Sequence, residues 1–173
     1  MKRFLVFFLG VALVVGFSVI PAGAKDLTKR VGLGYNSQIE FIVKDFQFQI
    51  TGPSIKYALS PKMGVQGIFG FNKYSNGEEL TTLGIGGKFF YNIIQEDNMN
   101  FYAGGGLGIL HVSNGDSENG VVIVGYIGDE FFFSGLPNLG FAAEVGIVTA
   151  SMFDQSYLGT YGGFLALGIH YYF

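Results

Sequence analysis

Hydrophobic and polar residues alternate along most of the chain after residue 24, in segments of about ten residues separated by turn-forming residues. In the first clear segment, Val31, Leu33 and Tyr35 share one face, and glycine or polar residues occupy the other. A period of two places successive side chains on opposite faces of a strand, so each segment is predicted to be a β-strand with one apolar face. Eight segments show this pattern: 30–36, 54–60, 63–73, 82–92, 100–113, 121–133, 141–147 and 162–173.

The connections between these segments alternate in length. Short turns follow the second, fourth and sixth segments, at residues 60–63, 95–98 and 135–140. Longer or more polar connections follow the other segments, including 36–53, the 114–120 stretch (a loop by its composition) and 150–162. This asymmetry is typical of outer-membrane barrels, which have short periplasmic turns and longer outer loops.

The connection 36–53 itself alternates, in residues 38–43 and 46–50, with Lys44-Asp45 placed like a hairpin turn. Its apolar positions are even-numbered after Asp45 and odd-numbered after Ser54, which predicts a β-bulge around Gly52-Pro53. Two interpretations stay open: the first two strands project beyond the membrane, or the connection is an ordered loop.

The first residues have the pattern of an export signal. Lys2 and Arg3 precede an uncharged apolar run from Phe4 to Ile20, and residues 22–24 read Ala-Gly-Ala. The run is also near the lower length limit for a transmembrane anchor. The basic flank and the small-residue site favour a cleaved signal peptide, residues 1–24, followed by one domain, residues 25–173.

Composition narrows the class of protein. The 173 residues include 28 Gly, 19 Phe and 10 Tyr but neither Cys nor Trp, and the net charge is −3. Without cysteine the fold has no disulfide and no lipid anchor on a thiol, and the acidic balance offers no basic patch for nucleic acid. No later apolar run is long enough for a spanning helix, and in a bilayer only a closed barrel otherwise satisfies every backbone group.

The prediction is therefore an all-β protein, an eight-stranded antiparallel up-and-down transmembrane β-barrel. A soluble lipocalin-like barrel would have the same periodicity with its apolar face turned inward. The opposite face here carries glycine, lysine, glutamate and asparagine, which suits a narrow, filled interior better than a large water-exposed surface. Strand parity directs one polar set into this interior: Arg30, Lys56, Gln66, Lys88, Glu130, Glu144 and His170. Because isolated buried charges are costly, the charged members of this set should pair or hold water.

One short motif could carry chemistry. Residues 110–114 read Leu-His-Val-Ser-Asn, and His111 and Ser113 share a strand face, so the imidazole could activate the hydroxyl. The motif resembles the H-x-S-N motif of outer-membrane lipid A deacylases, which are eight-stranded barrels too. That resemblance implies His111 as base, Ser113 as nucleophile and Glu118 as orienting carboxylate. In that family the motif lies on the penultimate strand, whereas here it ends the fifth. The other interpretation is a histidine at a loop edge followed by a turn.

The whole mature chain resembles the small eight-stranded outer-membrane barrel family that includes OmpX and the OmpA membrane domain. The resemblance rests on the signal-peptide end, the eight alternating segments, the Gly-Leu-Pro-Asn-Leu-Gly-Phe turn and the final Tyr-Tyr-Phe. It implies that the last strand is read by the barrel assembly machinery, through Gly168, Tyr171 and Phe173. No peptidoglycan-binding domain follows, so a link to the cell wall is not implied.

These patterns predict a monomer in the bacterial outer membrane, in contact with outer-membrane lipids and lipopolysaccharide. Its expected role is structural, or that of a surface-interaction protein that binds surface ligands through 36–53 and 150–162, without cofactor, metal or nucleic acid. Two alternatives remain: a lipid A-modifying acyl hydrolase using His111 and Ser113, or a conduit for small apolar molecules.

Overall fold

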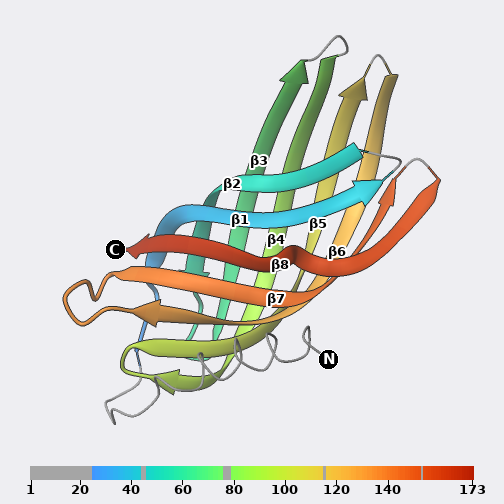
Figure 1. Cartoon of the computed structure of the whole chain (residues 1–173). Coiled ribbons are helices and arrows are strands. Elements are labelled where there is room, and N and C mark those ends of the chain that lie inside the picture. The colour runs from blue at the N-terminus through green and yellow to red at the C-terminus, as the bar shows by residue number, and fades with distance from the viewer. Residues whose placement is uncertain (1–24, 44–45, 76–78, 115, 153) are drawn as a thin grey trace, which may run out of the picture.

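The computed structural model describes residues 25–43, 46–75, 79–114, 116–152 and 154–173. The predicted signal peptide and the Lys44-Asp45 turn therefore lie outside the described residues. Eight antiparallel strands close into one barrel in sequence order, with β8 paired to β1 (Figure 1). The strands are β1 (Val31–Val43), β2 (Phe46–Ala58), β3 (Met63–Ser75), β4 (Glu79–Glu96), β5 (Met99–Asn114), β6 (Asp116–Phe132), β7 (Leu139–Met152) and β8 (Gln155–Tyr172). The predicted fold class is confirmed.

One end of the barrel, called here the inner end, holds Lys25, Phe173 and the three short turns. In the first turn, the amide N–H groups of Leu59 and Ser60 donate to the carbonyl of Met63, at 2.9 and 3.1 Å. In the third, Leu136 donates to Phe133 and Leu139 to Leu136. Pro61 in the first turn and Pro137 in the third have no N–H for a ladder, which is one reason why the strands stop there.

The opposite, outer end differs from the prediction. The 114–120 stretch is not a loop, because β5 and β6 remain paired up to Asn114 and Asp116. The 36–53 and 150–162 connections are likewise mostly strand, in the β1–β2 and β7–β8 hairpins. Hydrogen bonds across each hairpin pair the backbone N–H and C=O groups of these polar residues. Because this pairing does not depend on the type of side chain, the composition did not reveal the strands. The two ends therefore differ because the paired strands extend farther at the outer end, and not because long loops connect them there.

The predicted bulge exists on the other strand of the hairpin. Ser37 pairs with Thr51 and Ile39 with Ile50, so Gln38 of β1 is the extra residue, not Gly52 or Pro53 of β2. A bulge on either strand corrects a one-residue mismatch between the two strands, and the sequence pattern of one strand alone does not decide which carries it. Of the two interpretations of 36–53, the structure confirms continuous strands.

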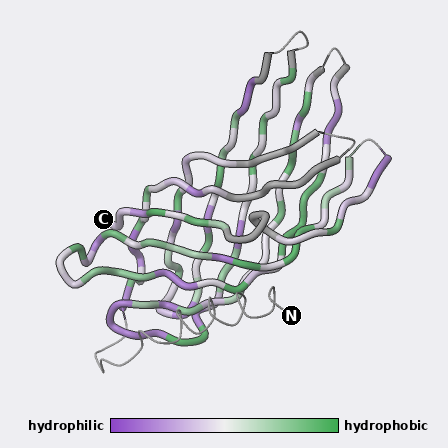
Figure 2. The backbone as a smooth tube through the Cα atoms, viewed as in Figure 1, coloured by the Kyte–Doolittle hydropathy of each residue, from purple (hydrophilic) through white to green (hydrophobic). Residues whose placement is uncertain are grey.

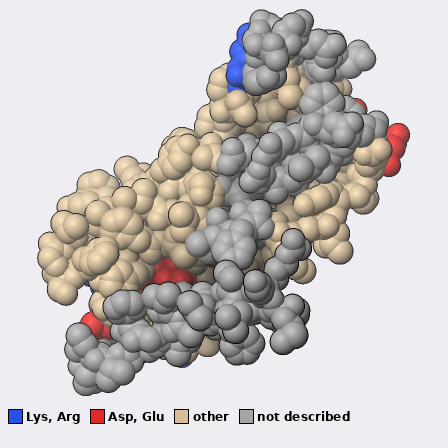
Figure 3. Space-filling view, in the orientation of Figure 1, with Lys and Arg blue, Asp and Glu red and all other residues tan. Residues whose placement is uncertain are grey.

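Outward and inward faces follow the predicted parity. Leu33, Ile55, Phe69, Ile85 and Leu107 are among the apolar side chains that are 47–65% exposed, and the tube in Figure 2 shows hydrophobic and hydrophilic residues alternating along the strands. On the face drawn in Figure 3, most of the described surface is uncharged. An apolar exterior on a closed barrel matches a lipid bilayer and not water. Among the described residues, no helix has the length and hydrophobicity needed to cross a membrane.

The lumen contains two apolar clusters. The larger one, which the prediction of a polar interior did not include, extends from the level of the charged side chains toward the outer end; its buried members comprise Ile68, Phe90, Tyr102, Leu110, Val112, Val122, Val124, Tyr126, Val148, Ala150, Met152 and Ala166. At the inner end, Leu27 of the segment before β1 packs against Ala58, Phe132 and Tyr172. Phe90 and Phe132 both face the lumen and are buried. Between these apolar groups lies a layer of charged side chains.

Candidate functional site

Two buried ion pairs cross the lumen between strands that are not neighbours in the barrel. Lys56 Nζ of β2 lies 3.1 Å from Glu130 Oε1 of β6, and Lys88 Nζ of β4 lies 2.6 Å from Glu144 Oε2 of β7. All four side chains are at most 4% exposed. Inward-facing positions of a narrow barrel meet across its axis, so residues far apart in sequence become partners. These four residues are brought together as the sequence predicted, and their formal charges cancel.

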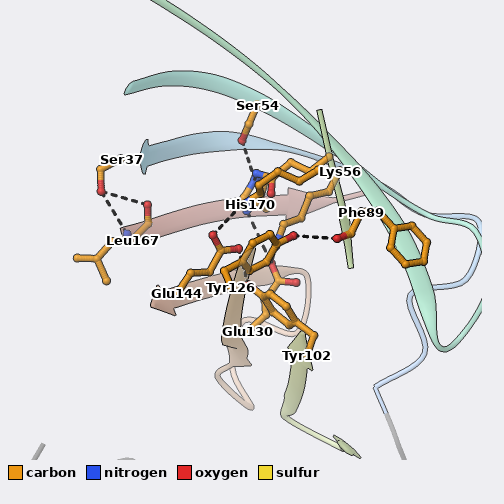
Figure 4. A network of polar contacts seen from close by, with 12 residues as sticks. Ser37, Ser54, Lys56, Phe89, Tyr102, Tyr126, Glu130, Glu144, Leu167 and His170 are labelled. Carbon is orange, nitrogen blue, oxygen red and sulfur yellow. Dashed lines mark hydrogen bonds and ion pairs between the residues drawn. The ribbon is translucent and has the colours of Figure 1, made fainter. Parts of the chain in front are cut away.

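Tyrosine hydroxyl groups complete the coordination of both carboxylates. Tyr172 donates to Glu130 Oε1 and Oε2 at 2.9 and 2.8 Å, and Tyr102 donates to Glu144 Oε1 at 2.8 Å. A buried charge pair is tolerated only when its remaining lone pairs also find donors. The tyrosines therefore belong to the same charged layer, called here the lumen network (Figure 4).

Aromatic ring faces surround both ammonium groups. Lys88 Nζ lies 4.6 Å from the ring centroid of Tyr126, and Lys56 Nζ lies 5.6 and 5.5 Å from those of Phe90 and Tyr102. The negative face of an aromatic ring attracts a cation, most strongly where water is excluded. The rings thus stabilise the lysine charges, and they belong to the apolar cluster that continues toward the outer end.

Glycines on the lumen face provide the space that the network needs. A Cβ atom at Gly106 would lie 2.8 Å from Lys88 Cγ, and one at Gly128 would lie 2.8 Å from Glu144 Cγ. Real Cβ atoms essentially never come so close. This steric need explains why inward positions of β5 and β6 so often carry glycine next to a long charged side chain.

His170 lies in a second part of the lumen network and is fully buried. Its Nε2 atom is 2.7 Å from Ser54 Oγ and 3.2 Å from Gln66 Nε2, and its Nδ1 atom is 3.7 Å from Glu130 Oε1. The sequence placed Gln66 and His170 in the lumen, and the structure joins them to Glu130.

Arg30, by contrast, does not join the charged layer. It is half-buried at the inner end, where its Nη2 group donates to the carbonyl of Tyr172 at 2.8 Å and to Asn138 Oδ1 at 2.9 Å. Its Nε donates to the main-chain oxygen of Phe173 at 3.3 Å. Arg30 lies one position before β1, at the rim of the barrel, where it binds the main-chain oxygens of Tyr172 and Phe173 and the side-chain amide of Asn138 rather than the lumen glutamates.

The H-x-S-N candidate is only partly assembled. His111 and Ser113 do share a face of β5, but Glu118 pairs with Val112, the buried residue between them, so its side chain belongs to the other face of the ladder. His111 Nδ1 instead lies 3.0 Å from the Oδ1 atom of Asn119, its neighbour across the ladder. The resemblance implied a carboxylate at this place, and an amide occupies it.

The three residues implied as an assembly signal lie near the closing seam of the barrel. Tyr171 and Phe173 are 46% and 69% exposed on the outward face. Gly168 pairs with Asn36 of β1, and a Cβ there would collide with Asn36 Oδ1. Their placement agrees with a position at the lipid interface, and their role in assembly stays a prediction.

Sequence reasoning missed four participants in the lumen network: Ser54, Tyr102, Tyr126 and Tyr172. Ser54, Tyr102 and Tyr172 have inward parity, which was visible in the pattern, but parity says nothing about depth along the lumen. Only the register between neighbouring strands gives that depth, and register depends on tertiary pairing. Among the described residues, no group of three or more His, Asp or Glu side chains is arranged to hold a metal ion.

Comparison with known proteins identifies the fold. No family model matches the chain, and no curated protein matches it. Among solved structures, the N-terminal β-barrel domain of Pseudomonas aeruginosa OprF matches with a TM-score of 0.51 and 12% identity, over 84% of this chain and 98% of that domain. Ail, the attachment invasion locus protein of Yersinia pestis, matches with a TM-score of 0.47 and 17% identity, over 84% of this chain and 99% of that protein.

At these identities the matches report the architecture and not a shared activity. The match to the OprF domain agrees with the closed barrel described above. The chain therefore has the fold of the small eight-stranded outer-membrane β-barrels.

Proposed function

We propose that the protein is a closed, non-conducting outer-membrane barrel with a structural role, which presents its outer hairpins to surface ligands. The observation that carries the proposal is the occupied lumen. The Lys56–Glu130 and Lys88–Glu144 pairs fill one level, and the apolar cluster between them and the outer end fills the next. An eight-stranded barrel has an interior just wide enough for side chains, so these two layers close it to ions.

The second support is the length of the strands. A tilted strand crosses a bilayer with about 9–11 residues. Here β4 and β8 each have 18 residues, β6 has 17 and β5 has 16. Beyond the last strongly exposed apolar residues of β5 and β6, Ile109 and Val121, the hairpin continues to Asn114 and Asp116. At 3.4 Å per residue this reaches roughly 17 Å past the apolar belt.

The outer hairpins present polar side chains suited to reversible contacts. Asn72 and Lys73 of β3, Ser117 and Asn119 of β6, and Ser156 of β8 are exposed. The apolar belt below them is suited to contact outer-membrane lipids and lipopolysaccharide, with the protein as a monomer. Backbone pairing within each hairpin restricts its conformation, which lowers the entropic cost of binding compared with free loops.

The two alternatives from the sequence gain less support. An acyl hydrolase built on His111 and Ser113 would lack the orienting carboxylate, since Glu118 lies on the other face of the ladder. A conduit for small apolar molecules would need a path past the lumen network, where the lysine and glutamate side chains are paired and buried.

Two experiments test the proposal. Purified protein reconstituted in planar bilayers is expected to give no steady ion conductance, and reproducible channels would overturn the closed-barrel part. For the surface role, the β1–β2 hairpin is shortened by replacing residues 38–50 with Asn-Gly, which fits a two-residue hairpin. Cells producing this variant are expected to lose adhesion or aggregation that cells with the intact protein show. Lys62→Ala, in an exposed inner turn, serves as the control, and equal adhesion by all three strains would refute the surface role.

A further inference from the structure

Asp129 is a charged side chain on the lipid-facing side of the barrel wall. Its neighbours on β6, Gly128 and Glu130, are buried and face the lumen, so the alternation of the strand turns Asp129 outward. It is half-buried there. Asp129 pairs directly with Phe101 of β5 and Ala143 of β7, and residues that pair directly across a ladder share a face. These two side chains therefore border the carboxylate on either side.

No described side chain supplies a counter-charge to this carboxylate. Among the residues that the structure describes, no lysine, arginine or histidine forms an ion pair with Asp129. The lumen lysines lie behind the wall and are bound to Glu130 and Glu144. A charged side chain on the lipid face costs free energy that rises with depth and is smallest near the headgroups. A cation that comes from the bilayer side would lower this cost.

A cluster of phenylalanine rings adjoins Asp129 on the same face. Phe131, two residues further along β6, pairs directly with Phe141 of β7. The ring of Phe133, just past the end of β6, lies 5.0 Å from the ring of Phe131 and 5.5 Å from that of Phe141, centroid to centroid. Phe133 and Phe141 are 52% and 36% exposed, so part of each ring stays open to a ligand.

A carboxylate beside aromatic rings suits one kind of ligand. The negative faces of the rings attract a cation, and sites of this kind recognise organic ammonium groups. The carboxylate accepts charge-assisted hydrogen bonds from the N–H donors of the same group. An anion would be repelled by Asp129, and a purely apolar group would leave its charge unpaired. The chemistry of the site therefore favours an ammonium group.

The depth of the site indicates where this ammonium group comes from. The site lies next to the β6–β7 turn at the inner end, one of the short turns that are periplasmic in outer-membrane barrels (Figure 1). Exposed aromatic rings near strand ends mark the interface between lipid and water. At about 3.4 Å per residue and a strand tilt of about 40°, Asp129 lies about 5 Å nearer the bilayer centre than Phe131. A phospholipid headgroup of the periplasmic leaflet that folds back onto the wall reaches this depth.

We propose that Asp129 and the adjoining phenylalanine rings bind the ammonium group of a phosphatidylethanolamine molecule in the periplasmic leaflet. The primary ammonium donates to the Asp129 carboxylate, and the rings lie on the side of the inner rim. Ala143 carries only a methyl group, which leaves room for the headgroup. The acyl chains follow the apolar belt past Ile127, which is 48% exposed. The site is separate from the outer hairpins, so it does not depend on the proposed surface role.

Native mass spectrometry of the intact protein tests the proposal. Protein in a mild non-ionic detergent is titrated with phosphatidylethanolamine, or with phosphatidylglycerol of the same acyl chains, which lacks the ammonium. One phosphatidylethanolamine is expected to bind about fivefold more tightly, equivalent to about 1 kcal/mol from one partly exposed ion pair and its cation–π contacts. Asp129→Asn should reduce this preference below about twofold. Asp97→Asn, which removes a half-buried carboxylate of the β4–β5 turn, is the matched control and should keep the preference.

Two further measurements separate headgroup binding from other roles of the aspartate. Phe133→Leu/Phe141→Leu keeps the carboxylate but removes two rings, and the preference should fall to about half. Glycerophosphoethanolamine, which has the headgroup without acyl chains, should not displace the lipid at equal concentration. Retained heat-modifiable migration on gels verifies folding of each variant. Equal binding of the two lipids by the intact protein, a preference that Asp129→Asn leaves unchanged, an equal loss in Asp97→Asn, or displacement by the soluble headgroup would overturn the proposal.

Discussion

The Lys88–Glu144 pair allows the strongest test of how the filled lumen is stabilised. Lys88→Met removes the ammonium that lies 2.6 Å from the buried Glu144 carboxylate, while the Tyr102 hydroxyl stays at 2.8 Å. Glu144→Gln leaves the Lys88 ammonium without its counter-charge. At 2.6 Å and an effective dielectric constant of about 20, the attraction that each change removes is about 6 kcal/mol.

Part of that attraction offsets the cost of desolvating two ions, so the observable effect is smaller. Removing one partner of a buried pair typically costs about 3–5 kcal/mol, and we expect each single variant to lower the free energy of unfolding by that amount. The double variant Lys88→Met/Glu144→Gln leaves no buried charge unpaired at this site. It should cost clearly less than the sum of the two single changes, with a coupling energy of about 2 kcal/mol or more.

Urea unfolding in lipid vesicles provides the measurement. Because the chain has no tryptophan, the β-sheet circular dichroism band and the gel mobility of unheated samples follow unfolding instead of indole fluorescence. Lys62→Met, which removes an exposed charge, is the control and should change stability by no more than about 0.5 kcal/mol. Single variants that cost under about 1 kcal/mol, or strictly additive costs in the double variant, would refute the reasoning.

Three further predictions test other levels of the structure. Gly106→Val should destabilise the barrel by about 1–3 kcal/mol in the same urea assay, since its side chain would collide with Lys88, whereas Gly135→Val, with open space around it, should have little effect. Deleting Phe173, a 69% exposed interface aromatic, should reduce the membrane-inserted fraction in cell fractionation, and full insertion would contradict the assembly-signal assignment. Ser113→Ala should leave the lipid A profile unchanged by mass spectrometry, and a changed acylation pattern would restore the H-x-S-N hypothesis.

The local pattern was enough to predict much of the wall. Alternation such as Val31, Leu33 and Tyr35 specifies which side chains share a face, because strand geometry has a period of two. The inward positions of Lys56, Lys88, Glu130 and Glu144 follow from parity in the same way, as their burial confirms. The outer hairpins were harder to predict, because residues 114–120 have the composition of a loop while their backbone is paired as strand.

The contacts between side chains in the lumen depend on the register between paired strands, which the pattern of residues along the chain does not contain. Parity says that Ser54, Glu130 and His170 all point inward, yet only the register of the ladders between their strands places them at the same depth. In the β5–β6 ladder, the register likewise places Glu118 on the opposite face from His111 and Ser113. A register follows from the pairing of two strands and not from either strand alone.

The sequence by itself thus determined the number of strands, the inward or outward direction of their side chains and the membrane-facing exterior, since each follows from a period-two pattern within one strand. Tertiary structure alone decided which charges pair, that the outer lumen is apolar, that Arg30 binds main-chain and amide oxygens at the rim, and that the β2–β3 ladder stops beside Ser54. These features arise where strands distant in sequence meet across the barrel or along its seams, and their geometry is fixed by closure of the whole sheet.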